Sequence, residues 1–388
     1  MADGGETLSI RLVEAIDRVP AATWDHCAGG DNPFVSHAFL SALEASQSVS
    51  VETGWLPRHL VLEDASGLVL GVVPAYLKGH SYGEYVFDHG WADAYERAGG
   101  RYYPKLQVAV PFTPVPGPRL LVPAGPERAR RLSTLASGLA QVTDDMGLSS
   151  CHVTFAADDD IQALRKLGFL IRYGEQFHWH NRGYASFDDF LAALASRKRK
   201  MIRKERETVR ESGIAVQALT GPEIKPRHWD AFFRFYTDTY DRKWGAPYLT
   251  RTFFDIAAAT LPDKVVLMMA ERDGIPVAGA LNLVGRDTIY GRNWGCAGDF
   301  KFLHFEACYY QAIDYAIAHK LARVEAGTQG PHKIQRGYLP VETHSAHYIR
   351  DPQIKAAIDN FIGRERRAMA REMAALAELS PYRKDGQD

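Results

Sequence analysis

The sequence predicts an α/β protein of two similar units, each a mixed and mostly antiparallel sheet flanked by helices, followed by a C-terminal helix. Its 388 residues exceed what a single hydrophobic core usually organises, so two domains are expected. Strand-like runs alternate with stretches of helical periodicity along the chain. Two strings also recur with one spacing: seven residues separate Gly168-Phe169-Leu170 from His178-Trp179, and seven separate Gly337-Tyr338-Leu339 from His347-Tyr348. Such an internal repeat indicates a duplicated unit.

The composition excludes several classes of protein. It is 46% hydrophobic and 24% charged with a formal net charge of −1, so a surface generally adapted to nucleic acid is not expected. The four cysteines, Cys27, Cys151, Cys296 and Cys308, form no CxxC pair, which predicts free thiols and no zinc site. The first residues lack a basic segment followed by an apolar one, so a cytoplasmic protein is expected.

The first half begins with a strand at residues 8–13 and a helix that starts near Ser36, a favourable N-cap. Residues 59–63 and 68–77 have strand composition. The turn residues 64–67 between them predict a hairpin.

Further strands are expected next. Residues 81–91 alternate polar and aromatic side chains as a strand does, whereas the four prolines of 108–122 restrict that run to an edge, a bulge or a splayed strand. A helix over 126–146, a strand over 151–155 and a shorter helix over 161–167 complete the half.

The second half repeats this order of elements. A basic helix over 196–206 precedes a hairpin over 265–283, a helix over 304–320 and a strand over 322–326. The following loop, 327–337, is too rich in glycine and polar residues to be core.

Apolar residues at helical spacing predict a C-terminal amphipathic helix with a charged opposite face. They are Ile354, Ile358, Phe361, Ile362, Met369, Met373 and Leu376. We expect this helix to cover the second unit; pairing with another subunit and peripheral contact with a membrane surface are the alternatives.

The repeated order places the boundary near residue 181. The predicted units are therefore residues 1–180, on the acceptor side, and residues 181–388, which hold the candidate active loop and the C-terminal helix.

This order of elements resembles the GNAT acyltransferase fold, and two such units in tandem resemble the Fem-type peptidoglycan-bridge aminoacyltransferases. The strings PRHLVLE, VPFTPVPGPRLL, FLHFEACYYQAIDYAI, EAGTQGPHKIQRGYLP and THSAHYI are similar to a bacterial Fem/GNAT-like family of peptidoglycan-biosynthesis-like N-acyltransferases. The resemblance covers residues 34–365. It implies two GNAT-like units and transfer of an acyl group to an amine, with a cell-wall precursor as substrate.

The sequence departs from ordinary GNAT enzymes at the loop that binds coenzyme A. That loop offers backbone N–H groups to a pyrophosphate at a helix N-terminus. Residues 114–119 and 298–301 stand in the corresponding places, and the prolines of the first lack such donors. No bound cofactor is expected. The absence favours aminoacyl-tRNA, the donor of Fem-type enzymes as a group, over acyl-CoA as co-substrate.

The basic helix has two interpretations. By position, the resemblance implies that Arg199 or Arg203 contacts a phosphate-bearing substrate, and a tRNA contact through residues 197–206 follows from the same idea. A solvated charged face with Glu205 and Glu207 as partners is an equal alternative.

The loop of residues 327–337 concentrates candidate catalytic chemistry. Lys333 and Arg336 are predicted to stabilise developing negative charge, with Gln329 and His332 binding substrate. The alternative is that the two cations are ordinary surface charges. We expect only the second unit to have a working site, because its loop is richer in such groups.

Two carboxylates are candidates for the general base. Glu306 lies in a first helical turn, where the helix dipole alone would stabilise it, and Glu325 interrupts an apolar strand and needs a partner. His304 is a substrate-binding candidate. It is also four residues from Cys308, but no third ligand joins them and a metal is not expected.

Polar and aromatic residues gather in the first half, and they are Lys78, Tyr82, Glu84, Asp88, His89 and Trp91. On a strand, Tyr82 and Glu84 would share one face. The group is predicted to bind the acceptor opposite the Lys333 loop. A hydrogen-bond network at a domain interface is nearly as good an explanation.

Together these observations predict an enzyme that transfers an acyl or aminoacyl group to an amine. The donor ester or thioester lies against the second unit, and Lys333 or Arg336 meets the charge of the tetrahedral intermediate. The alternative is a non-catalytic module that binds an envelope precursor or another phosphate-bearing ligand.

Overall fold

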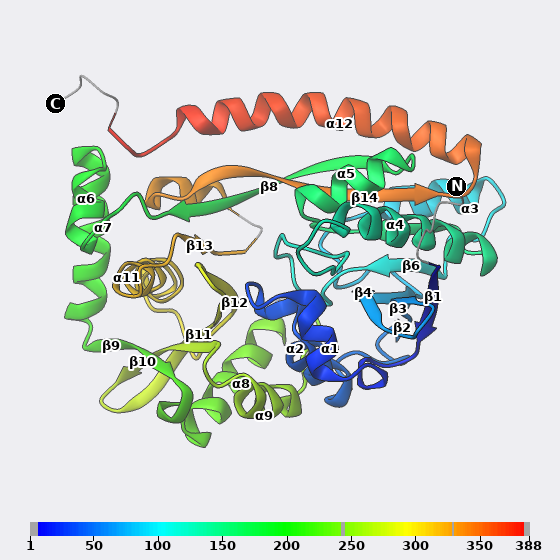
Figure 1. Cartoon of the computed structure of the whole chain (residues 1–388). Helices are drawn as coiled ribbons and strands as arrows, with labels where there is room; N and C mark the ends of the chain where they lie inside the picture. Colours follow the sequence, from blue (N-terminus) through cyan, green and yellow to red (C-terminus); the bar gives the residue numbers. More distant parts are fainter. Residues whose placement is uncertain (1–6, 242–244, 328–329, 384–388) are drawn as a thin grey trace. The chain divides into compact units, whose positions relative to one another are not determined.

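The computed structural model describes residues 7–241, 245–327 and 330–383 (Figure 1). Contacts between residues divide the chain into two compact units. The first comprises residues 1–174 and 342–370, and the second comprises residues 175–341 and 371–388. This differs from the single boundary near 181 that the sequence predicts, because two long strands carry the chain from one unit into the other. They are β8 (Leu170–His180) and β14 (Leu339–Ile349).

The first unit is built on two sheets. Its elements are β1 (Leu8–Val13), η1 (Ile16–Arg18), α1 (Ala21–Ala28), η2 (Pro33–Val35), α2 (His37–Ala45), β2 (Trp55–Pro57), β3 (His59–Asp64), β4 (Val69–Val73), β5 (Ala75–Lys78), α3 (His89–Arg97), β6 (Lys105–Val108), α4 (Arg128–Asp145), β7 (Ser150–Val153) and α5 (Asp158–Lys166). The small sheet has the order β1-β3-β4, and the larger has the order β2-β5-β6-β7-β14 within this unit. Strands β6 and β7 are parallel.

Helices α4 and α5 bury aliphatic side chains against these sheets, with Leu135, Leu139 and Leu164 fully buried. The C-terminal helix α12 (Pro352–Glu378) also belongs mainly to this unit. Its Ile358 and Ile362 pack with Trp91 and Tyr102. The expectation that this helix covers the second unit was therefore wrong for its buried face; Leu376, near its end, packs with the second unit's core.

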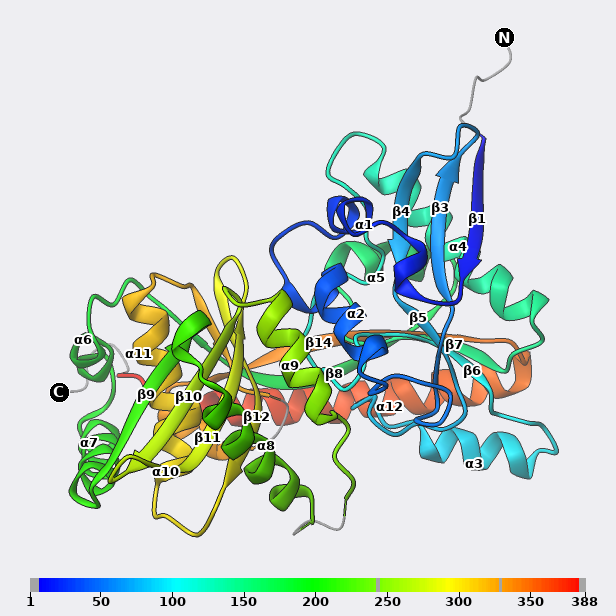
Figure 2. The same cartoon turned by 90° about the horizontal axis from the view of Figure 1, so that it is seen from below.

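The second unit is one sheet between two layers of helices. Its elements are α6 (Phe187–Ala192), α7 (Ser196–Glu211), β9 (Ile214–Thr220), η3 (Gly221–Glu223), α8 (Pro226–Asp241), α9 (Arg251–Thr260), β10 (Val265–Arg272), β11 (Ile275–Val284), β12 (Thr288–Cys296), α10 (Leu303–Phe305), the π-helix η4 (Glu306–Tyr310), α11 (Gln311–Ala318), β13 (Arg323–Glu325) and η5 (Pro331–Arg336). The sheet has the order β8-β13-β12-β11-β10-β9, and β12 and β13 are parallel. Figure 2 shows β9 to β12 side by side.

The duplication predicted from sequence is present in the fold. Each unit has an antiparallel hairpin, a further strand, a helix and then a strand parallel to that further strand. Gly168 and Gly337 both have positive φ, 79° and 94°, a conformation that glycine adopts without strain, and each precedes a strand of 11 residues. The recurring strings therefore mark equivalent turns.

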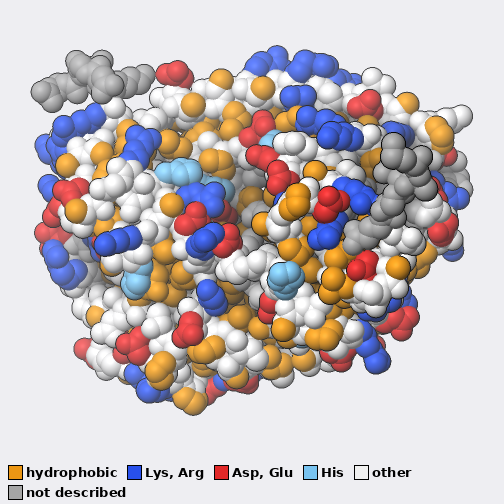
Figure 3. Space-filling view, viewed as in Figure 1, with side chains coloured by type: hydrophobic (Ala, Val, Ile, Leu, Met, Phe, Trp, Pro, Cys, Tyr) orange, Lys and Arg blue, Asp and Glu red, His pale blue; other side chains and the backbone are white. Residues whose placement is uncertain are grey.

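Two local predictions were wrong. Residues 81–88 form a loop instead of a strand, since Gly83 and Tyr85 take positive φ there and His89 begins a helix. The described part of the predicted loop 327–337 is also less exposed than predicted, because η5 buries Lys333, Ile334 and Arg336. In the face shown in Figure 3, basic and acidic side chains are interspersed over most of the surface. Within the described residues, no helix has the length and apolar character needed to cross a membrane.

Candidate functional site

A pocket opens in the second unit where two parallel strands separate. Residues 288–290 of β12 pair with 323–325 of β13, and the pairing stops there. Beyond it, a cavity of about 140 Å³ is lined by residues 280–282 of β11, 291–294 of β12 and 326–327 after β13. We call this the splay pocket. Its walls include backbone and small residues, so a ligand can approach the main chain closely.

A bulge in β12 shapes the pocket. Asn282 pairs with Gly291, whereas the preceding residue Leu281 pairs with Asn293, so Arg292 is an extra residue in β12. A bulge re-aims side chains and bends the strand, and bulges are common beside active sites. Here the bulge lies at the place where β12 leaves β13.

The opposite wall is the start of the helix predicted over 304–320. The structure divides it into α10, the π-helix η4 and α11, ending at Ala318. His304, Cys308 and Tyr309 line the pocket from this wall. Single π-turns in helices are frequent at functional sites. Burial raises the pKa of the Cys308 thiol, so it is not a ready nucleophile.

Lys333 lies behind the pocket, on η5. It is 2% exposed, and its Nζ donates to the carbonyl oxygen of Gly327, a pocket-lining residue, at 2.8 Å. Burial lowers the pKa of Lys333 to about 8. A buried ammonium with one acceptor among the residues that the structure describes has two further N–H groups for other acceptors.

A buried clamp holds η5 in place. Arg336 donates from Nη2 to Glu205 Oε1 on α7 at 2.7 Å and from Nη1 to the His332 carbonyl oxygen at 2.9 Å. Tyr310 of η4 donates its hydroxyl to the other oxygen of Glu205. The guanidinium carbon of Arg336 lies 3.5 Å from the centre of the Phe305 ring. Glu205 thus links the basic helix α7 to η5 and to η4, the two segments that flank the pocket.

Glu325 is at the last paired position of β13, just before the splay. It is 5% exposed, and burial raises its pKa to about 7 even though Arg323 is nearby. Its Oε1 lies 3.8 Å from His178 Nδ1 on β8. Because neighbouring residues of a strand face opposite sides and Val324 packs toward the α11 core, Glu325 faces away from that core.

Glu306, the other candidate base, is held by partners. It accepts from Arg206 Nη2 at 3.0 Å and from Gln311 Nε2 at 2.8 Å. Arg206 also donates to Asp314 at 2.7 Å. Glu306 lines a separate groove of about 840 Å³ along α7 and not the splay pocket. This arrangement favours a structural role.

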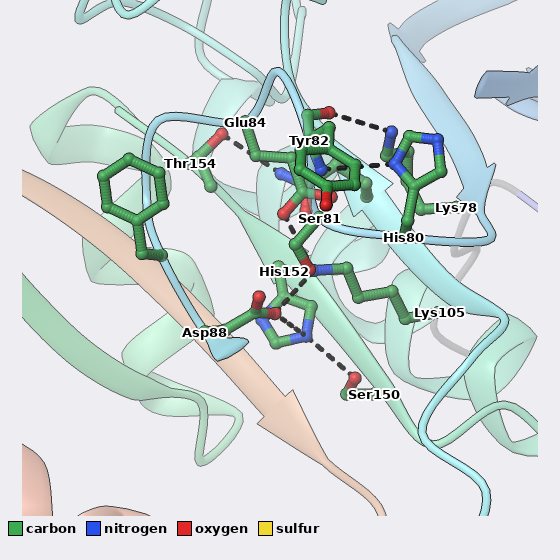
Figure 4. A network of polar contacts seen from close by, with 12 residues as sticks. Lys78, His80, Ser81, Tyr82, Glu84, Asp88, Lys105, Ser150, His152 and Thr154 are labelled. Atoms are coloured by element: carbon green, nitrogen blue, oxygen red, sulfur yellow. Dashed lines mark hydrogen bonds and ion pairs between the residues drawn. The ribbon is translucent and has the colours of Figure 1, made fainter. Parts of the chain in front are cut away.

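The first unit contains a buried network of charges (Figure 4). Lys105, fully buried at the start of β6, donates from Nζ to Glu84 at 2.8 Å, to Asp88 at 2.5 Å and to Ser81 at 2.8 Å. Burial raises the pKa of Glu84 to about 7. Burial alone would also raise the pKa of Asp88. Lys105 and His152 outweigh burial and lower the pKa of Asp88 well below its usual range.

The predicted polar-aromatic cluster therefore has some members that are buried and others that are exposed. Lys78 is fully buried over the Trp55 ring, with its Nζ 3.7 Å from the ring centre, and burial lowers its pKa to about 7. Trp91 is also buried, whereas Tyr82 and His89 are exposed. The centres of the two exposed rings lie 6.3 Å apart, with Tyr82 in the loop and His89 at the start of α3.

The place in the first unit that corresponds to the splay pocket is closed by the chain itself. Gly117 donates its N–H to the Phe155 carbonyl oxygen at 3.0 Å and forms a parallel bridge with Ala156. Arg119, fully buried, donates from Nε to the Thr154 carbonyl oxygen at 3.0 Å. The proline-rich segment, predicted as an edge, a bulge or a splayed strand, thus fills the space beyond β6 and β7.

Comparison with known proteins decides the family. The FemAB-like family, described as peptidoglycan biosynthesis/recognition, matches residues 15–384. The chain belongs to the FemAB-like family. No curated protein matches the sequence.

Two solved structures with TM-scores above 0.5 show the same fold as this FemAB-like chain. FemX matches with a TM-score of 0.55 and 12% identity, over 88% of this chain and 98% of FemX. The C-terminal domain of a putative lysylphosphatidylglycerol synthetase from Agrobacterium fabrum matches with 0.51 and 10%, over 89% and 96%. A tandem GNAT protein from the clavulanic acid biosynthesis pathway gives 0.47 and 12%, over 89% and 99%. At these identities the likeness concerns the fold alone. The family description relates the chain to peptidoglycan biosynthesis or recognition as its general class.

The structure brings some of the predicted residues of this FemAB-like chain together and separates others. His304 and Lys333 gather around the splay pocket; His332, exposed, shares a hydrogen bond of 2.9 Å with the pocket residue Tyr309. Arg203 is on the exposed face of α7 with Asp188 at 3.0 Å, and Arg199 lies on the same helix. Gln329 lies outside the described residues. No group of three or more potential metal ligands occurs in the described part of the chain.

Several residues of the sites were not predicted. Glu205 was considered only as a charge partner on a solvated face, and its place three residues after Ile202, on the inward face of the helix, was the available signal. His152 and His347, whose Nδ1 atoms lie 2.6 Å apart in the first unit, were also missed. The recurring string already contained His347 in the position equivalent to His178.

Proposed function

We propose that this protein transfers an acyl or aminoacyl group from an ester or thioester donor to an amine, with the donor bound at the splay pocket of the second unit. The separation of β12 from β13 beside a bulge carries this proposal. It exposes main-chain groups to a ligand in a small cavity, which suits a reacting carbonyl that has to be held against backbone donors. The family description, peptidoglycan biosynthesis/recognition, supports a cell-wall precursor as one of the substrates.

Lys333 is proposed to stabilise the negative charge that develops during transfer. Its ammonium is adjacent to the pocket-lining Gly327 and is buried, so its field acts in a medium of low dielectric constant. Arg336 is proposed to act indirectly. Its guanidinium is bound to Glu205 and the His332 carbonyl oxygen, which fixes η5 and therefore Lys333.

Glu325 is the better candidate for the general base. A base works best with a pKa near the operating pH, and its pKa of about 7 meets that condition. Its Oε2 has no partner among the described residues. Glu325 removes a proton from the attacking amine, and the amine nitrogen bonds to the carbonyl carbon. The bond from that carbon to the donor's ester oxygen or thioester sulfur then breaks, and the leaving atom takes the proton that Glu325 accepted.

The binding sites for the phosphate-bearing substrate and for the acceptor are proposed from exposed side chains. Arg199 and Arg203 on α7 are proposed to contact phosphates, whether of a tRNA or of a diphosphate-linked precursor. Tyr82 and His89, exposed above the buried charge network, are proposed to bind a cell-wall precursor as acceptor. The network of Lys78, Glu84 and Asp88 then supports their loop. The closed position at Gly117 and Arg119 supports a single donor site per chain.

A thermal-shift screen tests the proposal. Acetyl-CoA and longer acyl-CoAs are set against aminoacyl-tRNA and diphosphate-linked muropeptide precursors at two salt concentrations. A ligand at 100 times its Kd stabilises by about 2.7 kcal/mol, well within detection. A shift with a donor of either type supports the proposal, and Lys333→Met should then abolish transfer without abolishing every shift. A shift with precursor alone, and no transfer with any donor, would instead indicate a binding module.

A further inference from the structure

The segment that follows α12 lies against the second unit (Figure 1). We call residues 380–383 the strap. Pro381 lacks an N–H and cannot continue the helix, so the chain becomes extended there. The Pro381 carbonyl oxygen accepts from the Ala195 N–H at 2.9 Å, and the Arg383 N–H donates to the Ala193 carbonyl oxygen at 3.1 Å. These two bonds pair the strap with the link between α6 and α7.

Tyr382 is the side chain by which the strap reaches η5. It is 9% exposed, and its hydroxyl donates to the carbonyl oxygen of Gly337, just after η5, at 2.8 Å. Burial raises the pKa of Tyr382, so the hydroxyl keeps its proton and remains a donor. The ring packs edge-on against Phe190, and the Arg182 guanidinium carbon lies 4.3 Å from the ring centre. These contacts orient the hydroxyl toward η5.

One peptide group connects Tyr382 to Lys333. Its carbonyl belongs to Gly337 and accepts from Tyr382. Its N–H belongs to Tyr338 and donates to the Lys333 carbonyl oxygen at 3.3 Å. Hydrogen bonds in such a chain polarise and strengthen one another. The main chain of Lys333 is therefore only two hydrogen bonds away from the strap.

Gly337 permits this close approach. A Cβ atom at position 337 would lie 2.7 Å from Phe190 Cζ and 3.2 Å from the Tyr382 hydroxyl oxygen, so a side chain would push the strap away from η5. At Gly168, the equivalent turn of the first unit, the nearest atom to such a Cβ is Lys355 Nζ at 3.5 Å. The close fit therefore belongs to the turn beside Lys333 and not to the repeated turn in general.

The strap is held by few bonds. Besides those above, Arg383 Nε donates to the Leu194 carbonyl oxygen at 3.4 Å. A segment with so few bonds opens locally at a smaller cost in free energy than the strands of a sheet. When the strap opens, the Gly337 carbonyl oxygen loses Tyr382, and η5 loses its support at the end that follows Lys333.

We propose that the strap closes the Lys333 site and that Tyr382 is a positioning residue: its hydroxyl, bound to Gly337, keeps η5 in place and the Lys333 ammonium buried beside the splay pocket. Opening of the strap lets η5 move and water reach Lys333. A hydrated ammonium acts more weakly on a nearby charge, because water screens it. The effect on transfer rests on the proposed function of Lys333, whereas the effect on its burial is measurable without any substrate.

Competitive labelling of amines on the full chain measures this burial. A trace of acetic anhydride is added over a range of pH, and peptide mass spectrometry compares Lys333 with the exposed Lys320. In the wild type, labelling of Lys333 should have its midpoint near pH 8, since burial lowers the pKa of Lys333 to about 8. Hydrogen exchange of β10 and β11, read from the same protein, reports general opening of the second unit's sheet.

Two variants detach the strap to different degrees. Tyr382→Phe keeps the ring and removes the hydroxyl, so Lys333 should be labelled about tenfold faster relative to Lys320, the effect of one buried hydrogen bond. A chain that ends at Leu379 lacks the strap, and its midpoint at Lys333 should rise toward the ~10.4 of an exposed lysine.

Each variant has a matched control. Tyr348→Phe removes a tyrosine hydroxyl that donates to Asp144 in the first unit, and it should leave the labelling of Lys333 unchanged. A chain that ends at Arg383 keeps the whole strap and should label as the wild type does.

Transfer provides a second readout. The chain that ends at Leu379 should have a kcat at least about tenfold lower while KM changes less, because Lys333 acts on charge that develops in the transition state.

The outcomes separate the strap from the function proposed for Lys333. Equal labelling of Lys333 in the wild type, in Tyr382→Phe and in the chain that ends at Leu379 would overturn the strap. Faster labelling accompanied by equally faster hydrogen exchange throughout β10 and β11 would also overturn it, since that is general unfolding. If the shortened chain does not fold, Tyr382→Phe alone decides. Faster labelling of Lys333 alone, in a protein that transfers no acyl group, would support the strap and contradict the proposed function.

Discussion

His178 and Glu325 face each other across β8 and β13, with His178 Nδ1 3.8 Å from Glu325 Oε1. His178 Nε2 donates to Gln176 Oε1 at 3.1 Å, so Nδ1 is the unprotonated nitrogen on the side of the carboxyl group. Burial lowers the pKa of His178 to about 3 and raises that of Glu325 to about 7. Near neutral pH, the histidine is therefore neutral, and Glu325 is poised between its two protonation states.

The first unit has a pair at the equivalent register. His347 occupies the position in β14 that His178 occupies in β8, and it pairs with His152 of β7. These two imidazoles are buried, and burial lowers the pKa of both. A carboxyl group able to act as a base occurs only in the second unit's pair, in agreement with the closed position at Gly117 in the first.

Glu325→Gln is expected to lower the rate of transfer by about 10²–10⁴-fold, the usual contribution of a general base. Glu306→Gln is the matched control, because that carboxylate is bound by Arg206 and Gln311. It should change the rate by less than about tenfold. Steady-state rates at pH 7.5 check this. A larger loss of rate in the Glu306 variant than in the Glu325 variant would indicate that Glu306 is the general base.

The rate should have a bell-shaped dependence on pH. It rises as Glu325 loses its proton near pH 7 and falls as Lys333 loses its proton near pH 8, since the base must be deprotonated and the ammonium protonated. Lys333→Met should lower the maximum and remove the alkaline limb, whereas Glu325→Gln should remove the acid limb. A profile that keeps both limbs in both variants would show that other groups titrate.

Glu325 should also make stability depend on pH. Its folded pKa of about 7 exceeds that of an exposed glutamate, so the folded state binds the extra proton and stability falls as pH rises from about 4.5 through 7. Glu325→Gln should therefore melt higher than the wild type at pH 8, by a few degrees for each kcal/mol regained. At pH 4 the two proteins should melt alike. Differential scanning calorimetry at the two pH values makes the comparison.

Loss of one partner of the buried Glu205–Arg336 ion pair should strongly destabilise the fold. Both side chains are buried, and removing one leaves an uncompensated charge, so Glu205→Leu or Arg336→Met alone should cost about 3–5 kcal/mol of unfolding free energy. The double variant should cost less than the sum. Urea denaturation of the four proteins measures this coupling, and additive losses would show that the pair does not act as a unit.

The fold could be predicted well from sequence because periodicity and repeat spacing are local signals. Gly168 and Gly337 mark equivalent turns, and the basic run does form α7. The boundary near 181 differs from the contact-defined units because the exchange of β8 and β14 between units is a long-range property of pairing. Residues 81–88 alternate like a strand, but two residues with positive φ turn them into a loop.

The site was only partly predictable for the same reason. Lys333 and Glu325 were singled out by residue type and neighbours. Lys333 donates to the pocket-lining Gly327, and Glu325 precedes the pocket-lining Ala326 in the chain. Their burial, which sets both pKa values, depends on how η5 packs under Arg336 and Phe305. Asn282 carried no sequence signal, because an asparagine in an apolar strand is recognised only when its partners and the bulge opposite it are known.

The most direct test of the central claim is the formation of a new amide bond. Wild-type protein, Glu325→Gln and Lys333→Met are incubated with a muropeptide precursor that bears a free amine and with donors in turn, glycyl-, alanyl- and seryl-tRNA and acetyl-CoA. Mass spectrometry then measures acylated precursor. We predict product with the wild type, at least a hundredfold less with either variant, and unchanged folding by circular dichroism. Absence of product with every donor, or equal product from all three proteins, would contradict a transferase site at the splay pocket.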